Sequence, residues 1–87
     1  MRHLILAFRS RSQASRLYDR IKNYANARLI PTPTQIYPEC SLSVKTDEGS
    51  LSIALSLVKS ERLNTFIGAF IIDETAKTIQ KVSGFAP

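Results

Sequence analysis

Cys40 is the only cysteine in this 87-residue sequence, and we expect any chemistry of the protein to depend on it. A thiol is a good nucleophile only as the thiolate, so a working cysteine needs solvent access and a lowered pKa. Cys40 follows Pro38 and Glu39 in an expected loop, a position that favours access. Basic side chains at Arg28 and Lys45 would favour the thiolate if the fold brings them close, whereas Glu39 would oppose it.

Cys40 also has a purely structural interpretation, because free cysteine is among the residue types most often buried and inert. The segment Pro31-Thr32-Pro33, which precedes it, allows two interpretations as well. Two rigid residues, Pro31 and Pro33, would lower the entropy cost of holding the loop in one geometry. They could equally form a stiff connector with no further role, and the sequence leaves both alternatives open.

The other side chains that could do chemistry form no recognised pattern. His3 is the only histidine, so no metal cluster of known ligand spacing can be drawn, and we expect His3 near a strand end. The three glycines are scattered, which argues against a glycine-rich phosphate loop. The adjacent carboxylates Asp47-Glu48 and Asp73-Glu74 fall in expected turns, where we expect them to be solvated. We therefore expect no metal, no cofactor and no stand-alone enzyme.

The composition is that of one small soluble domain covering residues 1–87, with 44% hydrophobic residues. A single cysteine excludes an internal disulfide framework and favours a reducing compartment, so we expect a cytoplasmic protein. The apolar start of the chain ends at Arg9, which makes it too short for a signal-peptide core or a membrane span.

The net charge of +5 is concentrated in the first part of the chain. Residues 1–40 contain seven basic residues against two acidic ones, whereas residues 41–87 contain five of each. A one-sided basic surface favours acidic partners, either nucleic acid, an anionic substrate or an acidic protein face. A solvated basic helix face without a specific partner is the alternative.

Hydrophobic periodicity predicts an α+β domain. We expect strands at 4–8, 27–30, 42–46 and 66–72, helices at 10–26 and 51–63, and a further short edge strand at 78–82. Ser10 and Gln13 fit a capping box at the start of the first helix, and Asn64 could end the second helix in a left-handed conformation. The order β-α-β-β-α-β matches a ferredoxin-like sandwich, an antiparallel sheet with both helices on one face.

The residues resemble a family of small bacterial and archaeal proteins described as selenium/sulfur carrier-like. The resemblance covers nearly the whole chain in order and length. Its segments are Phe8-Arg9-Ser10, Ile30-Pro31-Thr32-Pro33 and Cys40-Ser41-Leu42-Ser43-Val44. The family pattern has an arginine after the second proline, where this sequence has Thr34, and a glycine after the cysteine, where it has Ser41.

The resemblance implies a carrier that accepts sulfur or selenium on Cys40 as a persulfide or selenosulfide and passes it to a partner. Such a carrier needs one accessible thiol and no cofactor, and a second cysteine nearby would discharge the persulfide as a disulfide. Its partners would be a protein donor, such as a cysteine desulfurase, and a protein acceptor, which could dock on the basic first helix. No membrane partner is expected.

Two other classes of function stay open on the sequence. One is a regulatory or structural binding module without thiol chemistry, which could form a homodimer. The other is a nucleic-acid-binding domain. Against it, residues 66–71 match an RNA-binding signature only faintly, lie on the wrong strand for it and lack its leading basic-glycine pair.

Overall fold

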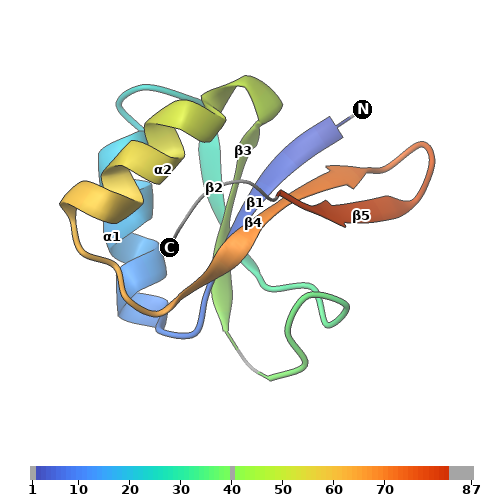
Figure 1. Cartoon of the computed structure of the whole chain (residues 1–87), viewed down its shortest axis with the longest axis horizontal. Helices are drawn as coiled ribbons and strands as arrows, with labels where there is room; N and C mark the ends of the chain where they lie inside the picture. Colours follow the sequence, from blue (N-terminus) through green and yellow to red (C-terminus); the bar gives the residue numbers. More distant parts are fainter. Residues whose placement is uncertain (1, 40, 83–87) are drawn as a thin grey trace.

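The computed structural model describes residues 2–39 and 41–82, so Cys40 lies outside the described residues. Two helices cover one face of a five-stranded sheet (Figure 1). The elements in chain order are β1 (Arg2–Phe8), α1 (Arg11–Ile21), β2 (Ala27–Pro31), β3 (Leu42–Asp47), the short 3₁₀ helix η1 (Glu48–Ser50), α2 (Leu51–Ser60), β4 (Phe66–Asp73) and β5 (Thr78–Lys81).

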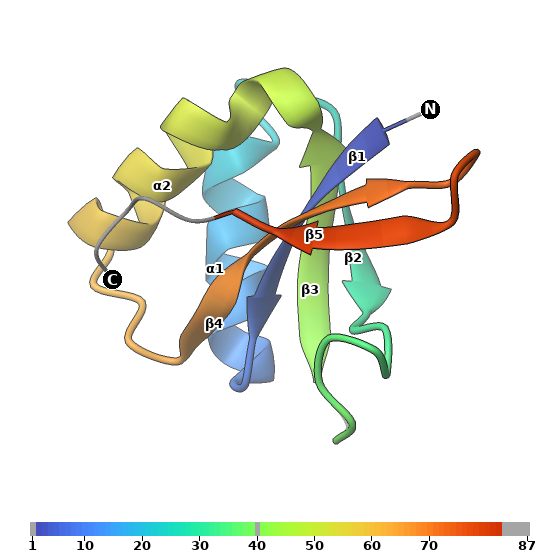
Figure 2. The same ribbon diagram turned by 45° about the vertical axis from the view of Figure 1, so that its right-hand side comes forward.

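The strand order in the sheet is β2-β3-β1-β4-β5, and every neighbouring pair is antiparallel (Figure 2). The predicted α+β class, with an antiparallel sheet and two helices, is confirmed. The expected short strand near the C-terminus is β5, which pairs with β4 at one edge. Within the described residues, no helix is long and apolar enough to cross a membrane.

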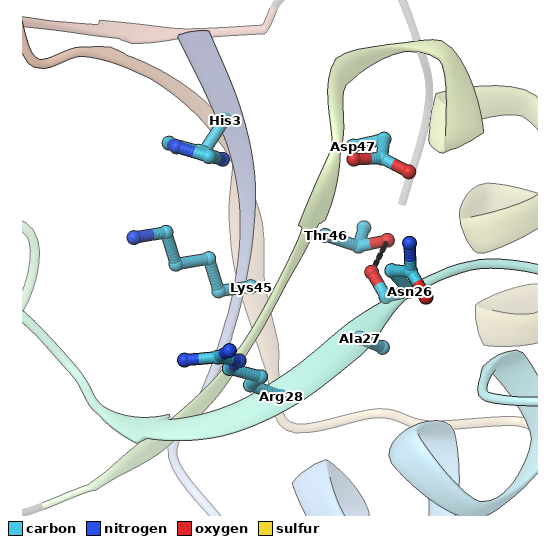
Figure 3. A pocket seen from close by; sticks show the side chains of 7 residues that line it. All are labelled: His3, Asn26, Ala27, Arg28, Lys45, Thr46 and Asp47. Atoms are coloured by element: carbon cyan, nitrogen blue, oxygen red, sulfur yellow. Dashed lines mark hydrogen bonds between the residues drawn. The ribbon is translucent and has the colours of Figure 1, made fainter. Parts of the chain in front are cut away.

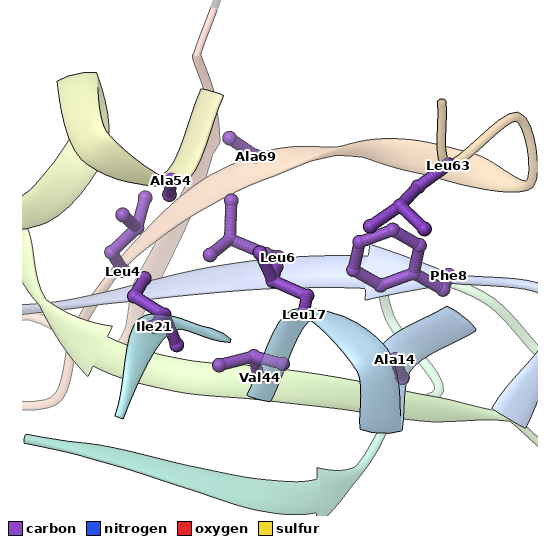
Figure 4. Close-up of a cluster of buried hydrophobic side chains, with 10 residues drawn as sticks. All are labelled: Leu4, Leu6, Phe8, Ala14, Leu17, Ile21, Val44, Ala54, Leu63 and Ala69. Atoms are coloured by element: carbon purple, nitrogen blue, oxygen red, sulfur yellow. The ribbon is translucent and has the colours of Figure 1, made fainter. Parts of the chain in front are cut away.

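The main hydrophobic core lies between the sheet and the two helices (Figure 4). Alternate residues of a strand point to opposite faces of its sheet, so Leu4, Leu6 and Phe8 of β1 all point toward the helices. Each is fully buried, and they pack with Leu17 of α1 and Ala54 of α2. The apolar stripe predicted for the first helix therefore faces this core.

The helix-free face of the sheet has a second, smaller cluster. Ile5 and Ala7 of β1 are fully buried there and pack with Phe70 of β4. Ile36, from the loop between β2 and β3, packs against this cluster. The loop that contains the candidate cysteine is thus attached to the helix-free face.

Helix α1 ends at Ile21, five residues before the predicted end at Asn26. The amides of Tyr24 and Ala25 both donate to the carbonyl of Ile21, at 2.9 and 3.0 Å, and this tightens the chain into a turn. The turn is fixed from the sheet, because the Thr46 hydroxyl donates to the Asn26 carbonyl at 2.7 Å. Strand pairing therefore overrides the helical pattern that continues in the sequence to Ala25.

The predicted capping box at α1 is only half formed. The Ser10 hydroxyl accepts the Gln13 amide at 3.4 Å, as predicted. The Gln13 side chain does not return to Ser10. Its Oε1 accepts both the amide and the hydroxyl of Thr65, at 2.9 and 2.6 Å, and its Nε2 donates to Asn64 Oδ1 at 2.9 Å. Gln13 thereby joins the start of α1 to the segment before β4.

The residue that ends α2 in a left-handed conformation is Arg62, with φ 53°, and not Asn64 as predicted. The amide of Leu63 donates to the Val58 carbonyl at 3.1 Å, and that of Arg62 to the Lys59 carbonyl at 3.2 Å. This pair of hydrogen bonds defines a Schellman motif, in which glycine is usual at the left-handed position. Leu63 is buried in the core, so the turn also positions a core side chain.

Replacing Arg62 with glycine should therefore stabilise the protein. A non-glycine residue in the left-handed region costs about 1–2 kcal/mol, which the extra flexibility of glycine in the unfolded chain offsets in part. We expect Arg62→Gly to raise the free energy of unfolding in urea by about 0.5–1 kcal/mol. The control is Arg62→Ala, which removes the same side chain and keeps the backbone cost. Equal stability of the two variants would contradict this account.

Candidate functional site

The predicted site residue Cys40 lies outside the described residues, so its exposure and reactivity stay predictions. The structure instead describes the loop on either side of it, residues 32–39 and 41, which connects β2 to β3. Within the described residues, no three His, Cys, Asp or Glu side chains gather in a way that could hold a metal ion.

The two ends of this loop are joined at its base. Pro31 and Leu42 form the last register pair of β2 and β3. Just beyond them, the Thr32 amide donates to the Ser41 carbonyl at 3.0 Å. The hydroxyls of Thr32 and Ser43 form a buried hydrogen bond of 2.6 Å, in which either oxygen can be the donor. These hydrogen bonds hold the base of the loop together, and the sequence did not indicate that the two hydroxyls would meet.

The arm of the loop that follows Pro33 forms a compact turn. The Pro33 carbonyl accepts the amides of Ile36 and Tyr37, at 2.9 and 3.1 Å. Ile36 then packs on the cluster of the helix-free face. The two prolines predicted to support the site thus have distinct positions: Pro31 ends a strand, and Pro33 begins the turn.

Tyr37 and Glu39 form a polar pair close to the cysteine in sequence. The Tyr37 hydroxyl donates to Glu39 Oε2 at 2.8 Å, and this hydrogen bond is the main reason that the pKa of Tyr37 is raised. The positive charge of Arg9, the residue that follows β1, acts on the same hydroxyl and partly opposes that shift. The Glu39 carboxylate, which we expected to oppose formation of the thiolate, thus accepts a hydrogen bond from a neighbouring side chain.

Ser41 stands where the family pattern has glycine. Ser41 is 4% exposed, and its hydroxyl has no hydrogen-bond partner among the described residues. A buried hydroxyl without a partner costs free energy. The position of Ser41 is therefore enclosed by its neighbours, and the enclosure leaves its hydroxyl without a partner among the described residues.

The fold places Arg28 next to Lys45, the two predicted sources of positive potential. They are direct register partners across β2 and β3. With His3 they line a hollow of about 550 Å³ (Figure 3). Arg28 and Lys45 lie three residues along their strands from Pro31 and Leu42, which corresponds to about 10 Å. Their influence on the Cys40 thiol stays a prediction.

Glu74 is a member of this hollow's charge network that the sequence did not indicate, because it was expected to be a solvated turn residue. Its Oε1 lies 3.2 Å from Lys45 Nζ and 3.3 Å from His3 Nε2. The hydrogen bond from Lys45 is the main reason that the pKa of Glu74 is lowered, and the charge of His3 acts in the same direction. The contact spans 29 residues, so only the sheet topology brings these groups together.

The comparison with family models provides the classification. Residues 3–66 match the model described as "Putative Se/S carrier protein-like". The match covers most of the chain, from β1 to the first residue of β4, and includes the loop with Cys40. The chain therefore belongs to this family, as its resemblance predicted. Among curated proteins, no match was found.

The buried hydroxyl pair at the base of the loop can be tested by substitution. In Thr32→Val the Ser43 hydroxyl stays buried without its partner, which should lower the free energy of unfolding by about 1–3 kcal/mol. The double variant Thr32→Val with Ser43→Ala replaces both partners and should recover most of that loss. Urea unfolding measures both values. A Thr32→Val protein as stable as the wild type would show that the pair does not fix the loop.

The Lys45–Glu74 contact predicts a specific pH dependence. Since the pKa of Glu74 is lower in the folded than in the unfolded chain, the contact stabilises the protein above the ordinary carboxyl pKa. That stabilisation is lost as the pH falls through the folded value.

We expect Lys45→Gln to move the Glu74 titration, followed by carboxyl-carbon NMR, upward toward its ordinary range. His3→Gln removes the weaker influence and should move it less. An unchanged Glu74 midpoint in Lys45→Gln would rule out the contact in solution.

Proposed function

We propose that this protein carries sulfur or selenium as a persulfide or selenosulfide on Cys40 and transfers it to a protein acceptor. The observation that supports this most directly is the membership of the chain in the Se/S carrier protein-like family. The second support is that Cys40 is the only cysteine of the sequence, so no internal thiol can discharge the carried atom as a disulfide.

The proposed transfer is a thiol exchange without net oxidation. The Cys40 thiolate attacks the outer sulfur of a persulfide on the donor protein, and a new sulfur–sulfur bond forms as the donor bond breaks. The donor cysteine leaves as its thiolate. The acceptor thiolate then attacks the outer sulfur held on Cys40 in the same way, which returns Cys40 to its thiolate. No cofactor is required for either step.

The described part of the loop supports this role by its rigidity. Its base is fixed by Thr32, Ser41 and Ser43, and its first arm is fixed by the turn at Pro33. A loop that is already ordered loses less entropy when it docks on a donor. The hydrogen bond from Tyr37 to Glu39 and the nearby charge of Arg9 would reduce the repulsion that Glu39 exerts on a thiolate.

The exposed basic side of α1 is the proposed docking surface for an acidic donor or acceptor. Arg16 and Arg20 are exposed on that helix, and Arg20 makes only a surface ion pair of 3.6 Å with Glu61. We place the protein in the cytoplasm, where a persulfide carrier would find reduced partners. We also infer a ferredoxin-like topology, which the order of β2, β3, β1 and β4 supports when β5 is taken as an added edge strand.

Intact-mass analysis tests the proposed function. The protein is incubated with a cysteine desulfurase and cysteine, alongside Cys40→Ser as the matched control. We expect the mass to rise by one sulfur in the wild type only, and a reducing thiol to release it. If the wild type gains no sulfur and its native thiol does not react with a thiol probe, a binding module without thiol chemistry replaces this proposal.

A further inference from the structure

The hollow of about 550 Å³ lies at the opposite end of β2 and β3 from the loop with Cys40. It is formed where β1 and β2 begin and β3 ends (Figure 3). Its lining residues are His3, Asn26, Ala27, Arg28, Lys45, Thr46 and Asp47. The carrier function proposed above uses none of this surface directly, so the hollow can be considered by itself.

Two positive charges are paired across neighbouring strands at the hollow, an arrangement that is unfavourable in a sheet. Arg28 and Lys45 face each other directly across β2 and β3, and like charges at such positions destabilise a sheet. Figure 3 shows that the nitrogen ends of Arg28, Lys45 and His3 project to the same side of the sheet. Three donors from three adjacent strands therefore lie on one side of the sheet, and all three line the hollow.

The positive charges are only partly compensated. Glu74, 54% exposed at its side chain, contacts Lys45 and His3 through one oxygen. Among the described residues, Arg28 makes no ion pair. Asp47, the acidic residue among those that line the hollow, projects away from the three nitrogen groups in Figure 3. The neighbouring Glu48 is already paired with Arg2 at 2.8 Å.

We propose that this hollow binds a small oxyanion of the phosphate class, held by Arg28 and Lys45, with His3 as a third donor when its imidazole is protonated. The Arg28 guanidinium can give two parallel N–H bonds to one phosphate, and Lys45 supplies a point charge. A tetrahedral anion has enough oxygens for all three groups, whereas a carboxylate is satisfied by the arginine alone.

In this proposal Glu74 is the internal counter-ion of Lys45 and His3. A bound phosphate would compete with its carboxylate for Lys45 and His3, so Glu74 would be displaced toward solvent. Its exposed position at the turn between β4 and β5 permits this movement. Removal of the Glu74 charge should therefore strengthen phosphate binding.

The occupant is a small anion and not a nucleic-acid chain, because none of the described residues that line the hollow is a phenylalanine, tyrosine or tryptophan. Recognition of single-stranded nucleic acid usually needs exposed aromatic side chains on which bases stack. Phe70 on the helix-free sheet face is 9% exposed and packed in a cluster, and the exposed Tyr24 is not among the residues that line the hollow. A concave, cationic site without exposed aromatics is suited to a compact ligand.

A titration with inorganic phosphate at constant ionic strength, followed by amide NMR, tests the proposal. We expect saturable shifts centred on residues 3, 26–28 and 45–47. Arg28→Gln and Lys45→Gln should each weaken binding roughly tenfold or more, since each removes charged hydrogen bonds. Arg28→Lys keeps the positive charge but lacks the paired N–H groups, so its affinity for phosphate should lie between those of the wild type and Arg28→Gln. Glu74→Gln should tighten binding a few-fold.

Arg16→Gln on α1 is the matched control, because it removes the same charge from an exposed position outside the hollow. Equal weakening by Arg16→Gln and Arg28→Gln would show an effect of net charge alone and overturn the proposal. The proposal is also overturned if binding does not saturate at phosphate concentrations well above about 1 mM, the dissociation constant of a weak site.

A phosphate monoester of a small metabolite, titrated in parallel, distinguishes a free from an esterified phosphate source; binding of either supports the site. Saturation by a single-stranded oligonucleotide but not by phosphate would replace the proposal with a polymer surface. The titration needs no sulfur on Cys40, so it and the loading experiment can succeed or fail separately.

Discussion

The burial of strand β1 on both of its faces is the constraint on which the rest of the structure depends. Residues Leu4–Phe8 have no exposed surface, and β1 pairs with β3 on one side and β4 on the other. Full burial of a leucine, isoleucine or phenylalanine side chain contributes about 1.5–3 kcal/mol. A strand buried in this way must occupy the centre of the sheet, and both helices and the β2–β3 loop are then placed around it.

The register of β2 on β3 follows from this arrangement and determines both candidate sites. Val44 and Leu29 are register partners that pack in the core beneath the helices. A slip by one residue would move these side chains to the other face, so the core fixes the register. The residues that alternate with them face the opposite side: Ser43, at the base of the loop, and the Arg28–Lys45 pair, in the hollow. Hydrophobic burial thus sets the positions of polar groups on the far face.

The turn between β4 and β5 completes the hollow from a distant part of the chain. Asp73 Oδ1 accepts the amides of Thr75 and Ala76, at 3.0 and 3.1 Å, and these bonds, with that of Ala76 foremost, lower the pKa of Asp73. Lys77 takes a left-handed conformation with φ 55°, which closes the turn. The local chemistry of this turn holds Glu74 beside Lys45 and so supplies the internal counter-charge.

The sequence by itself determined the elements and the family. Alternating and helical apolar patterns are local properties, so the α+β class, the order of the elements and the apolar stripe of α1 could be predicted from them. The segments around Pro31, Pro33 and Cys40 likewise indicated the family, because each is a short contiguous motif that can be recognised without the tertiary structure.

Tertiary structure decided what depends on residues that are distant in sequence. The end of α1, the partners of Gln13 and the choice of Arg62 over Asn64 follow from how each helix meets the sheet. The pairing of Arg28 with Lys45 depends on a register set across a loop, and the contact of Lys45 with Glu74 depends on β1 lying between β3 and β4. Strand neighbours are selected by burial of the whole core, a property that no local segment contains.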